Sequence, residues 1–186
     1  MPTERVRPAL SGAALLPFDS PPGGPYHCPV GQNTRVAVFG RADLEAGSEG
    51  YAQAEELGAL LAQAGCVVMS GGYTGAMEAV SKGAARAGGR AEGVACRASA
   101  GRRPNPYLPR CHWADDPLSR TRLLVEGADA CVALEPRAGT LAEVAVLWSL
   151  RKAGGLPERP LVLVGPSWDE IWGVWPQSRD EARKEA

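Results

Sequence analysis

The sequence predicts an α/β fold of the doubly wound, Rossmann-like kind, with a mainly parallel sheet and helices on both faces. Short apolar runs alternate with segments whose apolar residues recur at helical spacing. The runs are five in number and rich in β-branched residues, as buried parallel strands are. A length of 186 residues, with 45% hydrophobic and 22% charged residues, fits one globular domain.

The first half of the chain contains two strand and helix pairs. Arg35–Gly40 is an apolar run that stops at a glycine, and Tyr51–Ala64 carries apolar residues at helical spacing. Cys66–Ser70 is the second expected strand, and the glycine-rich turn 71–75 follows it. A helix is then expected over Ala76–Ala87, where two glycines close it.

The third strand and helix are separated by a long connection. Ala91–Cys96 is a weaker strand, because a glutamate and a glycine interrupt it. Ala98–Asp115 is expected to be a loop. Asp116 then fits a helix N-cap with proline at the first helical position, so a helix is expected from Pro117 to about Glu126.

The last strands and helix complete the sheet. Ala130–Leu134 and Pro160–Gly165 are the fourth and fifth strands, and 140–153 is the most apolar helix. The tryptophans 168, 172 and 175 are expected to cover the end of the sheet. In the strand order 3-2-1-4-5, the crevice between strands one and four is the expected ligand site.

The two ends of the chain differ in composition from this domain, which spans 34–175. Residues 1–33 contain seven prolines and four glycines, so they are expected to form an extended arm without regular ladders. Residues 176–186 form a polar, charged tail.

Charge and cysteine content exclude several classes of protein. The formal net charge of -1 gives no reason to expect nucleic acid or an anionic membrane as partner. Five cysteines without a C-x-x-C pair, and two histidines, suggest neither a disulfide framework nor a metal site. No segment has transmembrane length, and a reducing cytoplasm fits best.

The turn after the second strand has the features of an anion seat. Gly71, Gly72, Thr74 and Gly75 lead directly into a helix that begins near Met77. Crowded backbone amides and the positive end of a helix dipole suit a phosphate. The alternative is a tight turn that binds no ligand.

A similar arrangement follows the fourth strand, at Arg137, Gly139, Thr140 and Glu143. Thr140 and Glu143 have the spacing of a capping box, which the spacing alone favours. The alternative places the Glu143 carboxylate in the crevice, where it could hold a sugar hydroxyl, activate water or stabilise a developing cation.

An ordered set of motifs resembles the LOG (LONELY GUY) family over about residues 35 to 165. The matching motifs are Val38-Phe39-Gly40, Leu57-Gly58, Gly71-Gly72-Tyr73-Thr74-Gly75-Ala76-Met77-Glu78-Ala79, Gly88-Gly89, Arg120, Ala128-Asp129-Ala130 and Gly139-Thr140-Leu141-Ala142-Glu143. These Rossmann-like proteins were long labelled possible lysine decarboxylases. Characterised members are cytokinin riboside 5'-monophosphate phosphoribohydrolases, and a related branch binds molybdenum cofactor without turnover.

The resemblance implies roles for individual residues. Arg120 and Glu143 match the family's catalytic pair, and Gly139 and Thr140 match residues that hold the 5'-phosphate. Glycosidic cleavage builds positive charge on the ribose, so a carboxylate there would lower the barrier.

Two departures from the family pattern affect the anion seat. Where the family has Pro-Gly-Gly, this chain has Glu135-Pro136-Arg137, and where it has Gly-Ser, this chain has Gly40-Arg41. Pro136 removes an amide donor, whereas a guanidinium can replace lost amides. The hypothesis is that Arg41 and Arg137 remodel the seat for a different or larger phosphorylated ligand.

The expected function is hydrolysis of a nucleoside 5'-monophosphate to free base and ribose 5-phosphate, without a cofactor. The alternative is a non-catalytic protein that binds a nucleotide or molybdenum cofactor on the same scaffold. Pyridoxal-phosphate chemistry finds little support, because Lys82, Lys152 and Lys184 lack the setting of a cofactor lysine.

Homodimerisation through the 140–153 helix is also expected. This helix has almost no polar face, so both of its sides need cover. A second copy supplies that cover most simply, as in the resembled family. The alternative is burial under the N-terminal arm.

Overall fold

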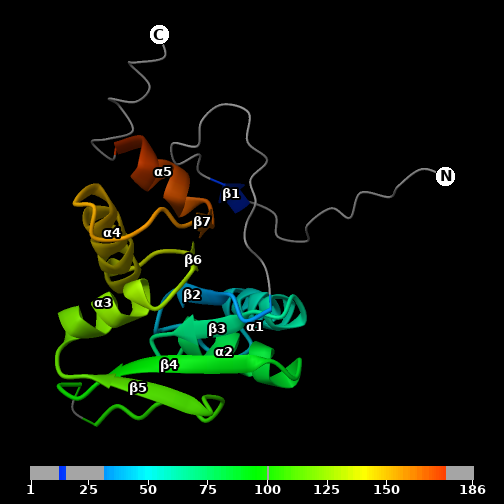
Figure 1. The fold of residues 1–186 in the computed structure, drawn as a ribbon. Coiled ribbons are helices and arrows are strands. Elements are labelled where there is room, and N and C mark those ends of the chain that lie inside the picture. The colour runs from blue at the N-terminus through cyan, green and yellow to red at the C-terminus, as the bar shows by residue number, and fades with distance from the viewer. Residues whose placement is uncertain (1–12, 16–31, 100, 175–186) are drawn as a thin grey trace.

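The computed structural model describes residues 13–15, 32–99 and 101–174 (Figure 1). The tail 176–186 lies outside the described residues, as does most of the arm 1–33. The strands are β1 (Ala13–Leu15), β2 (Arg35–Phe39), β3 (Val67–Ser70), β4 (Arg90–Cys96), β5 (Arg110–Ala114), β6 (Ala130–Ala133) and β7 (Leu161–Val164). The helices are α1 (Glu49–Gln63), α2 (Ala76–Arg86), α3 (Pro117–Glu126), α4 (Ala138–Lys152) and α5 (Ser167–Val174).

The strands form one sheet in the order β1-β7-β6-β2-β3-β4-β5. All neighbours from β7 to β5 pair in parallel, and only β1 is antiparallel to its neighbour. Val36 of β2, for example, lies opposite Val68 of β3 and Ala130 of β6. The five strands expected from the sequence appear as β4-β3-β2-β6-β7, which confirms the order 3-2-1-4-5.

Two additional strands correct the expectations for the connections. The expected loop 98–115 is wrong over Arg110–Ala114, which forms the edge strand β5 beside β4. The polar side chains of this strand have partners on another strand. Arg110 and His112 both pair with the buried carboxylate of Glu92 on β4. The arm likewise carries a short ladder, because Ala13–Leu15 pairs with β7 through a stretch free of proline.

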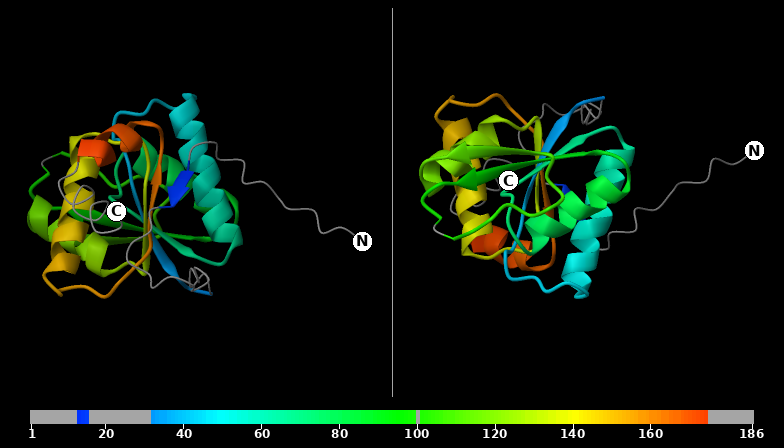
Figure 2. Two further views of the ribbon diagram at one scale, coloured as in Figure 1. Left: turned by 90° about the horizontal axis from the view of Figure 1, so that it is seen from above. Right: turned by 90° about the horizontal axis from the view of Figure 1, so that it is seen from below.

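Helices cover both faces of the sheet (Figures 1 and 2). Alternate residues of β2 point to opposite layers: Val36 and Val38 pack with α1 and α2, whereas Ala37 and Phe39 pack with α3 and α4. This alternation follows from the period of two in a strand. Trp168 of α5, 2% exposed, covers the end of β6 and donates to the Leu134 carbonyl, as expected. The side chain of Trp172 and the whole of Trp175 lie outside the described residues.

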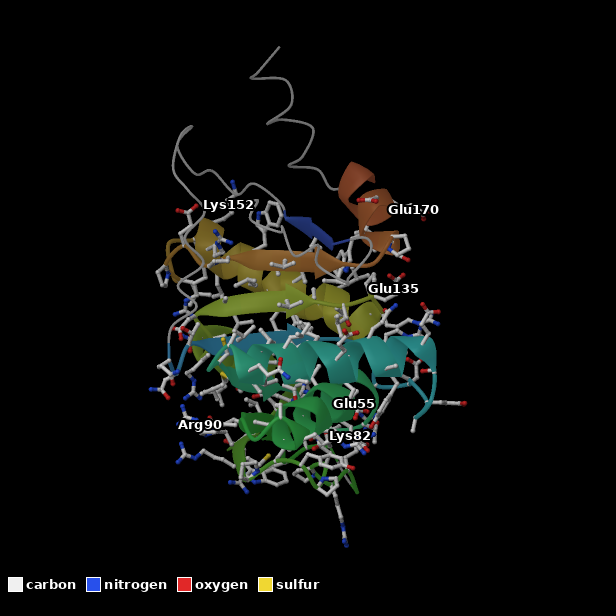
Figure 3. All side chains as sticks on the ribbon, turned by 90° about the vertical axis from the view of Figure 1, so that its right-hand side faces the viewer. Glu55, Lys82, Arg90, Glu135, Lys152 and Glu170 are labelled. Carbon is white, nitrogen blue, oxygen red and sulfur yellow. The ribbon has the colours of Figure 1, made fainter. Side chains whose placement is uncertain are left out.

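Helices α1 and α2 approach closely enough to require glycine at their contact. A Cβ atom on Gly83 would lie 1.8 Å from the Glu55 carbonyl oxygen, and one on Gly58 would lie 2.1 Å from the Val80 carbonyl oxygen. Lys82 Nζ and Glu55 Oε2 pair across this contact at 2.8 Å (Figure 3). Lys82 therefore belongs to the packing of these two helices.

The C-terminal end of α3 depends on one arginine from a distant loop. Arg159 Nη1 donates to the carbonyl oxygens of Val125 at 2.9 Å and Glu126 at 3.0 Å, and also to that of Ala128. A cation at this end of a helix satisfies unpaired carbonyls and complements the helix dipole.

We expect Arg159→Ala to lower the free energy of unfolding by about 1–2 kcal/mol, because these carbonyls lose their donor. The measurement is urea denaturation. The control is Arg122→Ala, a change within α3 itself. It removes an exposed i,i+4 ion pair with Glu126 and should lower the free energy of unfolding by less than about 0.5 kcal/mol. Equal losses of unfolding free energy in the two variants would contradict the stabilising role of Arg159 at the C-terminal end of α3.

Candidate functional site

A cavity of about 980 Å³ lies at the carboxyl ends of the central strands. The loops after β2, β4 and β6 form its walls together with the first turns of α3 and α4, as expected for the crevice of a doubly wound sheet. Its lining residues are Gly40, Arg41, Ala42, Asp43, Tyr73, Met77, Cys96, Ser99, Arg102, Pro117, Arg120, Arg137, Ala138, Gly139, Thr140 and Glu143.

Arg120 is held rigidly in the wall of this cavity. Helix α3 begins at Pro117 because Asp116 caps it, accepting from the Leu118 amide at 2.8 Å and the Ser119 amide at 3.0 Å. One turn later, Arg120 Nε donates to the Val94 carbonyl at 2.7 Å, and Nη2 donates to the Gly71 carbonyl at 2.9 Å. The remaining nitrogen, Nη1, is the one that faces Glu143.

Glu143 presents a buried carboxyl group to Arg120. It lies on the second turn of α4 and is 9% exposed. Its Oε1 is 3.7 Å from Arg120 Nη1, which is close enough for attraction but too long for a direct hydrogen bond. Burial raises the pKa of Glu143 to about 7, although Arg120 opposes the rise. The group therefore exchanges a proton near neutral pH.

The capping box that the spacing favours is not formed. Helix α4 begins at Ala138 with Arg137 as N-cap, so Thr140 lies inside the first turn. The Thr140 hydroxyl is buried and has no hydrogen-bond partner among the described residues, and the residue is 1% exposed. Because Thr140 and Glu143 both line the cavity, the capping role does not account for either side chain.

The turn 71–75 lines the cavity only through Tyr73, and its three glycines and Thr74 do not line it. Gly71 gives Arg120 room to approach, since a Cβ atom there would lie 1.7 Å from Arg120 Nη2. Gly75 has φ +67° and touches the Arg41 carbonyl, and Thr74 Oγ1 donates to the Ala42 carbonyl at 3.0 Å. The Gly72 amide is already bonded to a serine hydroxyl. The turn therefore supports the residues of the wall.

Arg41 and Arg137 meet at a carboxylate that the sequence analysis did not single out. Arg41 Nε and Nη2 donate to the two oxygens of Asp43 at 2.9 Å and 3.1 Å. Arg137 Nε lies 4.0 Å from Asp43 Oδ2. The Arg41 guanidinium holds the pKa of Asp43 below its usual range. Asp43 thus joins the loops after β2 and β6.

Tyr73 and Arg102 also line the cavity without having been predicted. The centroid of the Tyr73 ring lies 5.4 Å from the guanidinium carbon of Arg120 and 5.7 Å from that of Arg102. Its hydroxyl accepts from the Cys96 amide at 2.8 Å. Tyr73 belongs to the matched glycine motif, which is a usable signal, whereas Arg102 comes from a loop whose sequence gives no indication of its position.

Comparison with known proteins places the chain in a family. The model of the SLOG cluster4 family matches residues 33–159, which include every element from β2 to α4. The chain belongs to the SLOG cluster4 family. This membership confirms the resemblance to LOG-like proteins and molybdenum-cofactor carriers at the level of their common superfamily.

Solved structures with this fold include carriers of molybdenum cofactor. The carrier protein MCP from Chlamydomonas reinhardtii is 25% identical, with a TM-score of 0.62 over 76% of this chain and 83% of its own. The molybdenum cofactor binding protein from Rippkaea orientalis is 26% identical, with a TM-score of 0.58 over 65% and 74%. The structural-genomics target TM1055 is 31% identical, with a TM-score of 0.56 over 63% and 69%. No curated protein matches the sequence.

In this SLOG cluster4 chain, the residues predicted for the site divide into two groups. The cavity is lined by Gly40, Arg41, Met77, Arg120, Arg137, Gly139, Thr140 and Glu143. The residues that do not line it are Gly71, Gly72, Thr74 and Gly75. Glu135 lines a neighbouring cavity of about 620 Å³, which also includes Arg41 and Asp43.

The described residues offer little for a metal or a pyridoxal cofactor. No three of their histidine, cysteine and acidic side chains are grouped to hold a metal ion. Lys82 and Lys152 do not line the cavity, and Lys184 lies outside the described part of the chain. None of the described helices has the length and apolar character needed to cross a bilayer.

Proposed function

We propose that the protein hydrolyses the N-glycosidic bond of a nucleoside 5'-monophosphate, releasing the free base and ribose 5-phosphate. The observation that carries this proposal is the Glu143 carboxyl group, buried in the cavity, 3.7 Å from Arg120 and with a pKa of about 7. Perturbed carboxyl groups in a cleft are frequent catalytic groups. Membership of a LOG-like superfamily supports the same activity.

In this reaction Glu143 acts first as a carboxylate and then carries a proton taken from water. The bond between C1' and the base nitrogen breaks, its electron pair leaves with the base, and positive charge develops on the ribose. The carboxylate stabilises this charge and accepts a proton from water as the water oxygen bonds to C1'. The departing base takes up one proton from solvent, and Glu143 returns the proton that it took from water to solvent, so the reaction consumes one water and no net proton. Arg120 keeps the carboxylate at its place and limits the rise of its pKa.

The phosphate end of the substrate is assigned to the first turn of α4 and the loop after β2. The first turn of α4 presents Gly139 and Thr140, and Arg41 and Arg137 lie beside it. Helix N-termini and guanidinium groups both favour phosphate. The two arginines therefore compensate for the donors lost at Pro136.

The test is to incubate the protein with AMP, other nucleoside monophosphates and an N6-substituted AMP, and to follow free base by chromatography. Adenosine serves as the substrate without phosphate, and Glu143→Gln serves as the inactive variant. Release of base from a monophosphate, lost in the variant, is the expected result. No release from any monophosphate would contradict the proposal.

A second candidate function is favoured by the altered Glu135-Pro136-Arg137 turn and by the molybdenum-cofactor-binding proteins among the structural relatives. In this case the cavity holds a nucleotide or a molybdenum-cofactor-type ligand without turnover. Saturable binding of AMP by calorimetry without release of base would favour this function over hydrolysis.

We also propose a homodimer, and the structure suggests which face to examine. Apart from the exposed Ala138 and Ala142, the apolar side chains of α4 are buried or half-buried in the single chain, with Val144 and Leu147 fully covered. The exposed large apolar residues nearby belong to α3: Leu118 is 75% exposed and Leu123 is 44% exposed. Because α3 and α4 pack against each other, a second copy that covers α3 would also reach the outer side of α4.

A further inference from the structure

Asp43 occupies the anion side of the cavity with a negative charge of its own. Its two carboxylate oxygens accept from Arg41, and Oδ2 also lies 4.0 Å from Arg137 Nε. All three side chains line the cavity, and Asp43 is 60% exposed in its side chain. A carboxylate thus lies between the two cations that face the proposed phosphate position.

The backbone that carries Arg41 and Asp43 is fixed by the glycine turn. The Ala76 amide donates to the Arg41 carbonyl at 2.8 Å, and Thr74 Oγ1 donates to the Ala42 carbonyl at 3.0 Å. A Cβ atom on Gly75 would lie 2.4 Å from the Arg41 carbonyl oxygen, so only glycine permits this contact. The backbone of residues 41–43 is therefore held in place, whereas the side chains of Arg41 and Asp43 can change conformation.

We propose that Asp43 is an internal counter-ion that the phosphate of the ligand replaces. This inference rests on the proposal that the cavity binds a phosphorylated ligand. A carboxylate tethered on the same loop competes at a high effective concentration for the guanidinium groups. An anion that brings no other contacts competes poorly with it. A nucleotide brings ribose and base contacts as well and displaces it.

Two features of this chain support the coupling of Asp43 to the anion seat. Arg41 and Arg137 come from different loops, after β2 and after β6, and both approach the same carboxylate. Glu45, only two residues away, lines the neighbouring cavity instead and pairs with neither arginine in the described ion pairs. Glu135 also acts on Arg41 through its charge, but Asp43 is the carboxylate that lies within 4.0 Å of both arginines.

The experiment compares wild type, Asp43→Asn and the control Glu45→Gln by calorimetry at low ionic strength. The probes are ribose 5-phosphate and inorganic phosphate, which contain no glycosidic bond, and adenosine as an uncharged ligand. Asparagine keeps the shape of Asp43 and removes its charge. We expect Asp43→Asn to bind ribose 5-phosphate about three- to fivefold more tightly, the range typical of an exposed ion pair. Adenosine affinity and the behaviour of Glu45→Gln should match wild type.

The remaining outcomes overturn the inference. Weaker binding of ribose 5-phosphate by Asp43→Asn would mean that Asp43 orients Arg41 for the ligand. Unchanged binding, or no binding of either phosphate compound by either protein, would mean that the contact is a surface ion pair only. Release of base is measured separately, so loss of the hydrolase proposal and loss of this inference give different results.

Discussion

Glu143→Gln is expected to raise the free energy of unfolding by about 3 kcal/mol at pH 8 and by less than about 1 kcal/mol at pH 5. Burial raises the pKa of Glu143 from an ordinary 4.5 to about 7, and one pKa unit corresponds to about 1.4 kcal/mol. The folded protein therefore binds this proton more tightly than the unfolded chain does. Its stability falls as the pH rises from about 4.5 to about 7 and stays lower above that. Glutamine is neutral throughout and avoids this loss.

Urea denaturation of both proteins at the two pH values measures the difference. The control is Glu126→Gln, which removes a carboxylate paired with Arg122 at the surface. A difference between Glu143→Gln and wild type that is the same at pH 5 and pH 8 would contradict the raised pKa. If the proposed function is correct, the stabilised variant also loses release of base by about 10³-fold. Wild-type activity should then rise with a midpoint near pH 7.

Arg120→Met is expected to lower the free energy of unfolding by about 2–4 kcal/mol and to raise the pKa of Glu143 further. The Val94 and Gly71 carbonyls lose their donor, and unsatisfied buried acceptors are costly. Arg120 is the group that favours the carboxylate form of Glu143, so its removal favours the protonated form. Methionine keeps the length of the side chain but supplies neither the charge nor the donors.

Carbon-13 NMR of labelled glutamate side chains follows the Glu143 titration, and urea denaturation gives the stability. Arg122→Met is the matched control, because Arg122 lies two residues further on the same helix and is exposed. A Glu143 titration that stays near pH 7 in Arg120→Met would show that Arg120 does not act on this carboxyl group.

The central part of the fold could be predicted because its signals are local. Each of the five predicted strands is a short, largely apolar run that ends at a glycine or a turn, and the order of these strands follows from the connections allowed in a doubly wound sheet. Strand β5 has no such signal. Arg110 and His112 are polar because they pair with Glu92, whose position on β4 is visible only in the sheet.

The candidate site was predictable to a similar extent. Glu143 and Arg120 come together because the ends of β5 and β6 lead α3 and α4 to the same crevice. The spacing of Thr140 and Glu143 is the same in a capping box and in a cavity wall. Which of the two forms depends on where α4 begins, and α4 begins at Ala138 with Arg137 as N-cap. The contact of Asp43 with Arg137 joins loops 94 residues apart, and no local pattern encodes it.

Strand β1 has a consequence for aggregation. Without it, the parallel sheet would end at β7, whose four residues Leu161–Val164 are all apolar. An open apolar edge offers unpaired N–H and C=O groups to strands of other molecules. Ala13–Leu15 closes this edge with a register that sets Ala13 opposite Val164. A short segment of the Pro- and Gly-rich arm thus protects the sheet against intermolecular pairing.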